Sequence, residues 1–506
     1  MRAAENREGI SMDADVIIVG AGPTGLMLAG ELRLGGASVV VVERLPRPTG
    51  QSRGLGFTAR ALESFEQRGL IPRFPGLETS PMGHFGGLQF DYTVLEGAHF
   101  GARGIPQSQT EAVLETWALE LGAEIRRGWE FTDLAQDEDG VEITVATLDG
   151  EQQLRAAYLV GADGGNSPVR KAAGFSFSGT AATRGMYLAD VTGCELRPRF
   201  LGERLDGGMV MAAPLAEGVD RIIACERGTP PAGRSETPEF AEVAAAWQRL
   251  TGEDISGGGA DWVSSFTDAT RQAGEYRRGR VLLAGDAAHI HLPAGAQGLS
   301  TGIQDAVNLG WKLAAVVDGW APPGLLDTYH SERHPVGARL LMNTRAQGEV
   351  FLGGTEADPL RELLTELIEN DDVKKHLAGM VSGLDIRYDM GGAEGPDGGH
   401  PLLGRRLPHR TLRTASGERS SAELLHTAQG VLLDLADDHV LRQASADWKD
   451  RVLTVTATAA EPDDAAVFAG AAGVLVRPDG YVAWAGADAG QLTAGLTRWF
   501  GPAAVL

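Results

Sequence analysis

The stretch DVIIVGAGPTGLMLAGELRLGGASVVVVE, residues 15–43, decides how the rest of the chain folds. Residues 16–19 and 39–42 are short apolar runs rich in valine and isoleucine, which is typical of strands that are buried on both faces of a parallel sheet. Residues 20–25 match G-x-G-x-x-G, and a helix is expected to follow them. The order of strand, glycine-rich turn, helix and strand predicts a dinucleotide-binding βαβ unit.

The residues of the turn suit a pyrophosphate. Gly20 permits the tight turn, Gly22 lets backbone N–H groups approach the phosphates, and Gly25 lets the helix lie close to the sheet. Pro23 and Thr24 complete the turn, and the helix N-terminus adds a partial positive charge.

Glu43 ends the second strand, roughly 20 residues beyond the glycines. A carboxylate there suits a ribose 2′-hydroxyl and repels a 2′-phosphate. A glycine-rich turn that binds no ligand is the alternative, and the motif alone does not separate NAD from FAD.

Length and charge limit the classes of function. The chain has 506 residues, which predicts two or three domains of roughly 150 residues each. Its formal net charge of −23 argues against nucleic acid and anionic membranes as partners. The two cysteines, Cys194 and Cys225, are too few for a disulfide framework. The first eleven residues do not read as a signal peptide and no apolar run is long enough to span a bilayer, so we expect a cytoplasmic protein.

Two later stretches also end a predicted strand in an acidic residue. The sequence YLVGADGG (158–165) leads from a buried strand through Asp163 to a helix predicted at 168–173. Asp163 caps that helix or contacts a cofactor, and both roles can hold together. In the stretch 280–319, a strand at 281–284 leads to Gly285-Asp286, and a loop rich in proline and glycine then reaches a helix that should start near Ser300. The N-terminus of that helix favours an anionic or electron-rich ligand.

Two patterns in the last stretch suggest other chemistry. Residues 298–302 match G-x-S-x-G, but a nucleophilic serine needs a sharp turn directly after a strand, and here a long loop intervenes. Asp286, His289 and His291 are metal-ligand types, but they lack the spacing of a known site, so we expect no metal.

The other segments predict the layout around this core. Residues 175–275 read as antiparallel strands with one helix near 238–250, and this sheet would roof a ligand site. Met209, Met211 and Phe85 are pocket candidates, although such residues are more often plain core. Residues 325–385 read as helices, and the glycine-rich residues 390–401 form a linker before a small α/β domain.

Two polar residues allow more than one interpretation. Arg53, in the loop SRGLG, is either a solvated charge or a contact to cofactor or substrate. Gln107 opens a predicted helix and either caps it or touches a ligand.

Three motifs in order, the fingerprint, Asp163-Gly164 and Gly285-Asp286, resemble those of the FAD-dependent aromatic hydroxylases of the para-hydroxybenzoate hydroxylase type. Segments such as RGLGFTARALE, CERGTPP and YRRGRVLLAGDAAHIHLPAG look like the aromatic polyketide hydroxylases of angucycline biosynthesis. The resemblance runs from Asp13 to the end of the chain.

The resemblance implies an α/β fold: a Rossmann-like FAD-binding domain with an inserted antiparallel sheet domain and a C-terminal thioredoxin-like domain that, as here, lacks redox cysteines. The expected limits are 13–72, 104–174 and 276–390 for the FAD-binding domain, 73–103 and 175–275 for the substrate-binding middle domain, and 402–506 for the C-terminal domain.

The resemblance also implies roles for single residues. It puts Glu43 on the adenosine ribose of FAD, Arg44 and Gln107 along the cofactor, Asp286 on the ribityl chain, the backbone of Gly298, Leu299 and Ser300 at the flavin pyrimidine edge, Arg53 near flavin and nicotinamide, and Asp163 between the FAD and NADPH regions. Two positions depart from the group, which often has glycine where Ala296 stands and asparagine where Ser300 stands. These departures bear on flavin mobility and on the contact at the flavin edge.

The implied reaction is hydroxylation of a polycyclic aromatic polyketide. NADPH would reduce FAD, O₂ would form the flavin C4a-hydroperoxide, and the carbonyl of Pro293 would hold the peroxide proton. Baeyer–Villiger oxygenation of a similar polyketide and a redox-inert flavin-binding protein are the alternatives. A homodimer is a further expectation.

Overall fold

The computed structural model describes residues 12–229, 231, 237–391, 399–468 and 470–503. The expectations for the first eleven residues and for most of the linker at 390–401 lie outside the described residues. Within the described part, no helix has both the length and the apolar character that crossing a bilayer requires.

The quoted stretch folds as β1 (Ala14–Val19), α1 (Pro23–Leu34) and β2 (Val39–Glu43), which confirms the βαβ prediction. β1 lies between two parallel neighbours, β2 and β8, near the middle of an eight-stranded sheet. The remaining strands of this sheet are β5 (Glu124–Arg127), β6 (Glu130–Gln136), β7 (Val141–Thr147), β8 (Gly150–Gly161), β16 (Arg277–Arg278) and β17 (Val281–Leu283).

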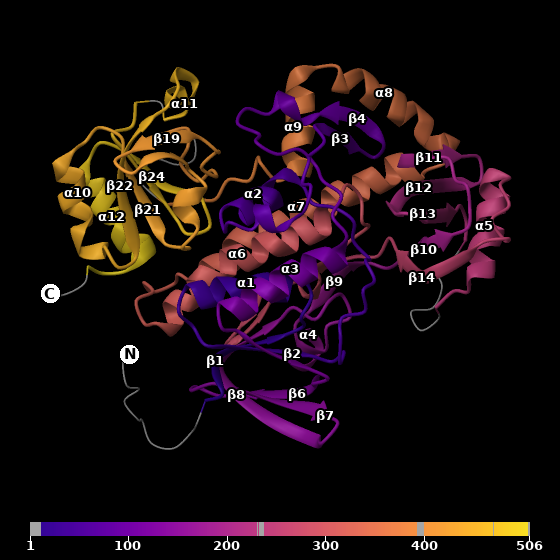
Figure 1. The fold of residues 1–506 in the computed structure, drawn as a ribbon, viewed down its shortest axis with the longest axis horizontal. Coiled ribbons are helices and arrows are strands. Elements are labelled where there is room, and N and C mark those ends of the chain that lie inside the picture. The colour runs from indigo at the N-terminus through magenta and orange to yellow at the C-terminus, as the bar shows by residue number, and fades with distance from the viewer. Residues whose placement is uncertain (1–11, 230, 232–236, 392–398, 469, 504–506) are drawn as a thin grey trace.

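Helices cover this sheet and pack closely on one another (Figure 1). α1 contacts both α3 (Gln107–Glu120) and α6 (Gln297–Val317). A Cβ at Gly30 would lie 2.1 Å from the ring of Trp117, and one at Gly310 would lie 2.4 Å from Cβ of Glu31, so glycine is what lets these helices touch. The other helices of this body are α2 (Ala59–Glu66), α4 (Pro168–Ala172) and α7 (Asp327–Leu352).

A five-stranded antiparallel sheet stands beside the body, as the segment 175–275 predicted. Its strands are β10 (Gly185–Thr192), β11 (Arg199–Leu205), β12 (Gly208–Ala216), β13 (Val219–Glu226) and β14 (Gly259–Thr267). α5 (Phe240–Thr251) covers it with the buried Val243 and Trp247. The sequence analysis missed β11 and a small sheet of β9 (Phe177–Thr180), β15 (Thr270–Ala273) and β18 (His289–Ile290).

The hairpin of β3 (Met82–Phe85) and β4 (Leu88–Asp91) packs against α8 (Asp358–Ile368) and α9 (Asp371–Ser382). Phe85 belongs to this cluster.

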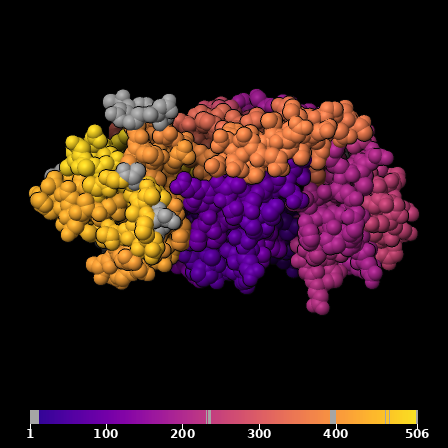
Figure 2. Space-filling model, turned by 90° about the horizontal axis from the view of Figure 1, so that it is seen from above, coloured from indigo at the N-terminus to yellow at the C-terminus, as the bar shows by residue number. Residues whose placement is uncertain are grey.

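The C-terminal segment folds as a thioredoxin-like domain. A parallel pair, β21 (Gly430–Asp434) and β22 (Val452–Ala459), is followed by an antiparallel hairpin and a helix. The other elements are β19 (Thr411–Thr414), β20 (Gly417–Ser420), β23 (Gly473–Val476), β24 (Val482–Gly486), α10 (His439–Ser445), α11 (Pro462–Val467) and α12 (Ala489–Phe500). Figure 2 shows this domain at one end of the molecule, the five-stranded sheet at the other and the Rossmann-like body between them. The exact domain limits stay a prediction.

Candidate active site

The three motifs meet at one edge of the eight-stranded sheet. β1, β8 and β17 are parallel neighbours, with Val19 opposite Gly161 and Gly161 opposite Leu283. The residues that follow these strands therefore leave the sheet at the same carboxyl edge, where ligands bind in open α/β sheets. Gly20, Asp163 and Gly285 are brought together although 265 positions (20 to 285) separate the first and the last.

Each glycine of the fingerprint is required for a different physical reason. Gly20 has φ +107°, and a Cβ there would lie 2.4 Å from the carbonyl oxygen of Ala162. A Cβ on Gly25 would lie 2.0 Å from the carbonyl oxygen of Gly20, so the predicted tight turn and close helix are present. At Gly22 nothing lies within 4 Å, so packing does not require glycine there, whereas the approach of a phosphate does. α1 begins at Pro23 without a side-chain cap, and Thr24 packs against Gly285.

Glu43 lies beside this turn. One carboxylate oxygen accepts a hydrogen bond from Ala21 N (3.0 Å) and the other from Leu45 N (2.9 Å). The carboxylate is thereby fixed at the end of β2, and each oxygen keeps a second lone pair for a ribose hydroxyl. Arg44 is exposed and has no hydrogen bond within the described chain.

We expect Glu43→Gln to weaken FAD binding about tenfold or more. The amide offers one acceptor in place of two, and hydrogen bonds to a charged group contribute about 1.5–3 kcal/mol. Titration of the apoprotein with FAD, followed by flavin fluorescence, measures the change. Glu115→Gln, which alters an ion pair with Arg127 on the surface side of α3, is the control. Equal FAD affinity in both variants would speak against the ribose role.

Asp286 and Arg53 face the same region from segments far apart in sequence. The side chain of Asp286 keeps accessible surface, yet it lies so deep among protein atoms that burial raises its pKa. The electrostatic effects of His289 and of the guanidinium of Arg53 oppose this rise in the pKa of Asp286. Among the described residues neither Asp286 nor Arg53 has a hydrogen bond or ion pair. Both side chains keep accessible surface, so they are available to a polar ligand that binds at this edge of the sheet.

The loop that carries Arg53 is held from two sides. Gln107 accepts from Gly54 N (3.1 Å) and donates to Glu111 (2.8 Å), so its amide positions the loop at the start of α3. From the five-stranded sheet, Arg221 donates to the carbonyl of Ser52 while it pairs with Asp190 at 2.7 Å. Arg221 was not predicted from the sequence, because no local sequence pattern distinguishes a strand residue whose side chain reaches another domain.

Asp163 is not the N-cap of α4. The N-cap is Ser167, whose hydroxyl accepts a hydrogen bond from Arg170 N (2.9 Å). Asp163 lies before it in the chain and accepts a hydrogen bond from Val169 N (3.0 Å), which is also in the first turn of α4. Its other oxygen, Oδ1, is buried and has no hydrogen-bond partner. Burial raises the pKa of this carboxyl. An orphaned oxygen at the ligand edge fits a donor supplied by a bound cofactor.

Asp305 of α6 ties the Gly285-Asp286 turn to the rest of the body. It is fully buried and accepts from Gly285 N (3.1 Å), the ring of His289 (2.9 Å) and Nε of Arg333 (2.7 Å). Nε2 of His289 is thereby held by Asp305, while its Nδ1 is buried without a hydrogen-bond partner, and the absence of a metal here stays a prediction. Asp305 was not predicted as a site residue from the sequence. An acidic residue among the apolar residues of this helix was the signal that could have identified it.

α6 begins at Gln297, three residues before the predicted start near Ser300. The reason is Ala296, the N-cap, whose left-handed backbone (φ 57°) turns the loop into the helix early. Gly298, Leu299 and Ser300 consequently form the first turn. The exposed Pro293 precedes this turn, and its carbonyl oxygen accepts no hydrogen bond from the described residues.

His291 packs beside this first turn. Its ring would lie 3.2 Å from a Cβ at Gly298, and Nδ1 lies 2.7 Å from the carbonyl oxygen of Leu292. Burial lowers the pKa of His291 to about 4, so the ring is neutral at physiological pH.

Ala296→Gly should stabilise the protein by about 0.5–1 kcal/mol. An alanine in the left-handed region costs about 1–2 kcal/mol of strain, which glycine avoids. Glycine gives back about 0.4–1 kcal/mol of this gain, because its unfolded chain has more conformational freedom to lose. Ala428→Gly, at φ 53°, should behave alike, whereas Ala288→Gly, at φ −93°, should destabilise. Denaturant unfolding compares the three, and a loss of stability in both left-handed positions would contradict the expectation.

Ser300→Ala should keep most activity and cost about 1–2 kcal/mol of stability. The Ser300 hydroxyl is buried, accepts from Thr58 N (2.9 Å) and donates to the carbonyl of Ala296 (3.0 Å), so its loss orphans a buried N–H group. A fluorophosphonate probe should not label the wild-type protein. Stoichiometric labelling of Ser300 would revive the hydrolase interpretation.

An apolar cluster lies where the five-stranded sheet meets the loop before α6. Its members are the buried Met186, Met209, Cys225, Leu292 and Leu352, with Met211, Ile223, Phe266, Ala294 and Phe351 packed against them. Met209 and Met211, two of the predicted pocket candidates, belong to it. A separate cavity of about 620 Å³ lies between α6, α7, α9 and the C-terminal domain, and Glu43, Arg53 and Asp286 do not line it.

A Rossmann-like dinucleotide site beside an antiparallel sheet, with a thioredoxin-like domain attached, defines a flavin-dependent aromatic monooxygenase. Residues 13–344 match the FAD binding domain, and residues 400–503 match the C-terminal domain of aromatic-ring hydroxylases. The chain belongs to the FAD-dependent aromatic hydroxylases of the para-hydroxybenzoate hydroxylase type, and the predicted fold class and FAD cofactor are confirmed.

Three similar proteins span almost the whole chain. The 12-dehydrotetracycline 5-monooxygenase/anhydrotetracycline 6-monooxygenase of Streptomyces rimosus subsp. rimosus is 44% identical and covers 98% of this chain and 100% of its own. The crystal structure of CabE, an aromatic hydroxylase from angucycline biosynthesis, is 60% identical with a TM-score of 0.93 and covers 97% of this chain and 100% of its own. The dialkyldecalin synthase of Streptomyces rugosporus is 41% identical and covers 97% and 100%.

Proposed function

We propose that this protein uses FAD and NADPH to hydroxylate a polycyclic aromatic polyketide of the angucyclinone type. The observation that carries the proposal is the 60% identity, over 97% of the chain, to an aromatic hydroxylase from angucycline biosynthesis. The tetracycline-type monooxygenase at 44% identity supports the same class of substrate.

In this proposal the cofactor lies along the carboxyl edge of the sheet. The turn of Gly20, Gly22, Pro23, Thr24 and Gly25 holds the pyrophosphate with the N-terminus of α1. The other cofactor contacts are Glu43 on the adenosine ribose, Arg44 and Gln107 along the cofactor, Gly285-Asp286 on the ribityl chain, Gly298, Leu299 and Ser300 at the pyrimidine edge, and Asp163 between FAD and NADPH.

FAD, when bound, supplies hydride acceptance and the activation of O₂. Arg53 is the proposed cationic contact at flavin and nicotinamide, and the geometry that supports it is an unpaired guanidinium on a loop fixed by Gln107 and Arg221. The carbonyl of Pro293 would accept a hydrogen bond from the proton next to the transferred oxygen, since no described residue donates to it. The first turn of α6 would place N–H donors where negative charge gathers.

The substrate rings would lie on the methionine-rich cluster between the five-stranded sheet and the loop of Leu292. Thioether side chains adapt to flat aromatic rings. Two segments far apart in sequence, the sheet and the loop, would thus enclose the rings and exclude water from the reacting atoms.

The test is turnover of the flavin-loaded protein with angucyclinone precursors. We expect NADPH to bleach the bound flavin without O₂, and one atom of ¹⁸O₂ to appear on an intact aromatic ring. A lactone or a cleaved C–C bond would instead identify Baeyer–Villiger oxygenation. Gel filtration of the same protein tests the homodimer.

A second candidate function follows from the similarity to a dialkyldecalin synthase, whose name denotes a different reaction on a chain 41% identical to this one. The same scaffold could then hold flavin without redox turnover. A bound flavin that NADPH fails to bleach, with or without polyketide, would favour this candidate over the monooxygenase.

A further inference from the structure

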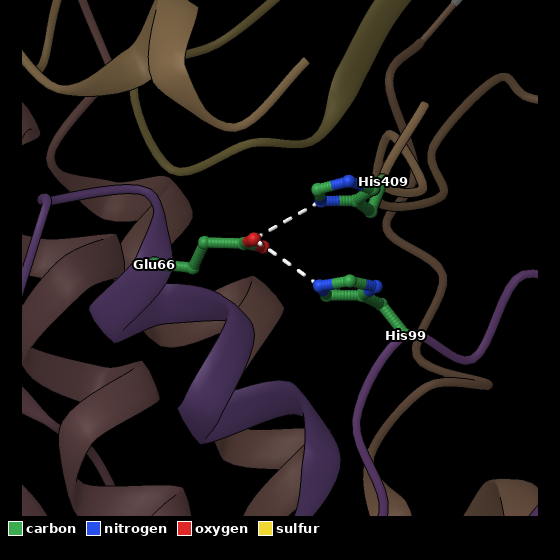
Figure 3. Close-up of side chains that lie close together, drawn as sticks. All are labelled: Glu66, His99 and His409. Carbon is green, nitrogen blue, oxygen red and sulfur yellow. Dashed lines mark ion pairs between the residues drawn. The ribbon is translucent and has the colours of Figure 1, made fainter. Parts of the chain in front are cut away.

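Three side chains of metal-ligand type converge outside the FAD site (Figure 3). Glu66 ends α2, His99 lies in the loop after β4, and His409 lies in the segment that leads into β19. Because these positions are remote in sequence, their spacing could not suggest a site.

The three ligand atoms surround a common point. Oε1 of Glu66 is 3.4 Å from Nε2 of His99 and 3.0 Å from Nδ1 of His409, and all three atoms lie within 4.8 Å of one another. Zn²⁺ with ligands at about 2.0–2.1 Å in a tetrahedron separates neighbouring ligand atoms by roughly 3.4 Å. The two distances to Glu66 are close to that separation.

The carboxylate of Glu66 forms an ion pair with each of the two rings, drawn as dashed lines in Figure 3. The two imidazole rings stack with centroids 3.8 Å apart and planes 6° from parallel, and the carboxylate oxygen lies to the side of the stack in Figure 3. Nδ1 of His409 is buried and has no hydrogen-bond partner, although the oxygen is near. Two imidazole nitrogens beside one carboxylate oxygen form the donor set of a transition-metal site.

The carboxylate of Glu66 faces the two imidazole rings. Its neighbour Glu63 is already paired, with Arg406 at 2.9 Å and with Arg60 at 3.6 Å. His99 is the most open member, with 40% of its side chain exposed, so its ring can tilt out of the stack toward an ion.

We propose that Glu66, His99 and His409 bind a divalent transition-metal ion of the Zn²⁺ type, with water completing the coordination. Two imidazoles and one carboxylate favour Zn²⁺ over Mg²⁺, which prefers oxygen ligands. This site is distinct from Asp286, His289 and His291, where the sequence predicted no metal. Because His409 precedes the C-terminal sheet and the other two ligands belong to the body, the ion fastens the two together.

The test uses the full-length, flavin-loaded protein after treatment with a chelator. Titration with ZnCl₂ in a calorimeter should show one ion per chain, and CoCl₂ should give the visible absorption of a four-coordinate Co²⁺ site. His99→Ala and His409→Ala should each weaken Zn²⁺ binding by more than about tenfold, and MgCl₂ should not bind. Zn²⁺ should also raise the unfolding temperature of the wild type but not of these variants.

His426→Ala is the matched control. The ring of His426 also contacts Glu66, but at the backbone carbonyl of Glu66 (3.1 Å) and not at its carboxylate. It should bind Zn²⁺ like the wild type. Since His99 lies at the surface, its replacement leaves the fold intact and keeps the test decisive. Absence of Zn²⁺ binding in the wild type, or stoichiometric binding that survives both His99→Ala and His409→Ala, would overturn the proposal.

Discussion

The Asp305→Ala protein should lose about 3–5 kcal/mol of unfolding free energy and purify with little or no FAD. Its carboxylate is the anion that neutralises the fully buried guanidinium of Arg333, and removing one partner of a buried pair leaves an uncompensated charge. The same oxygens fix His289 and the backbone of Gly285, so the turn that presents Asp286 loses its support. Denaturant unfolding and the flavin absorbance of the purified protein measure the two effects.

The protonation of Asp305 does not limit this effect at ordinary pH. Burial alone would raise its pKa, but Arg333 and His289 outweigh burial and hold the pKa below its usual value. A lowered pKa in the folded state means that the contribution is present above the unfolded pKa and is lost only as pH falls through the folded one. The wild type should therefore keep this contribution across neutral pH.

Asp318→Ala is the matched control, because Asp318 is an exposed aspartate at the C-terminal end of the same helix. Its loss should change stability by less than about 0.5 kcal/mol and leave FAD content unchanged. If Asp305→Ala behaved like Asp318→Ala, Asp305 would not be the anchor of the turn.

The fingerprint was predictable because its causes are local. The strand pattern of β1 and β2, the glycines of the turn and the position of Glu43 follow from backbone geometry within 29 residues (15–43). The convergence of Asp163 and Asp286 with this turn was predictable too, since each ends a buried parallel strand. Their functional roles stay predictions, because FAD geometry itself is not part of the fold.

The other features depend on contacts between remote segments. Ile303, Val307 and Leu313 recur at helical spacing and mark one buried face of α6. The structure also buries the opposite side, including Asn308 and Lys312, because the C-terminal domain covers it. Polar residues at helical spacing look solvent-exposed until the covering domain is known. Arg221 and the cluster of Glu66, His99 and His409 escaped prediction for the same reason.

A turn of the C-terminal domain inserts into the body of the protein. Between β23 and β24, Arg477 donates to Glu332 (2.6 Å) and Asp479 accepts from Asn308 (3.1 Å). Glu332 also accepts from Lys312 (2.7 Å). All of these residues are buried, and burial lowers the pKa of Lys312 to about 8 although Glu332 opposes the shift. A network of this kind depends on every member.

Apolar contacts surround that network. Trp311 and Ala315 of α6 share a core with Trp499 and Phe500 of α12, and the ring of Trp311 lies 6.3 Å from that of Phe500. The C-terminal domain therefore packs on the catalytic body through a shared apolar core. Removing the domain would expose this apolar surface together with charges that are now buried in the interface.

Ending the chain at Pro401 should consequently abolish most soluble expression, the largest effect that we expect from any change to this protein.

Arg477→Ala should act in the same direction with a cost of about 3–5 kcal/mol, because the buried carboxylates of Glu332 and Asp479 would lose the guanidinium that they share. Arg498→Ala, on the exposed side of α12, is the control and should be nearly neutral. Any soluble truncated protein should still bind FAD, since Glu43, Asp163 and Asp286 lie outside residues 402–506. Gel filtration, thermal unfolding and flavin content are the measurements. A truncated chain with native yield and native unfolding temperature would show that the inserted turn contributes nothing to stability. Soluble truncated protein without FAD would show that α6 needs the C-terminal domain over it to hold the cofactor.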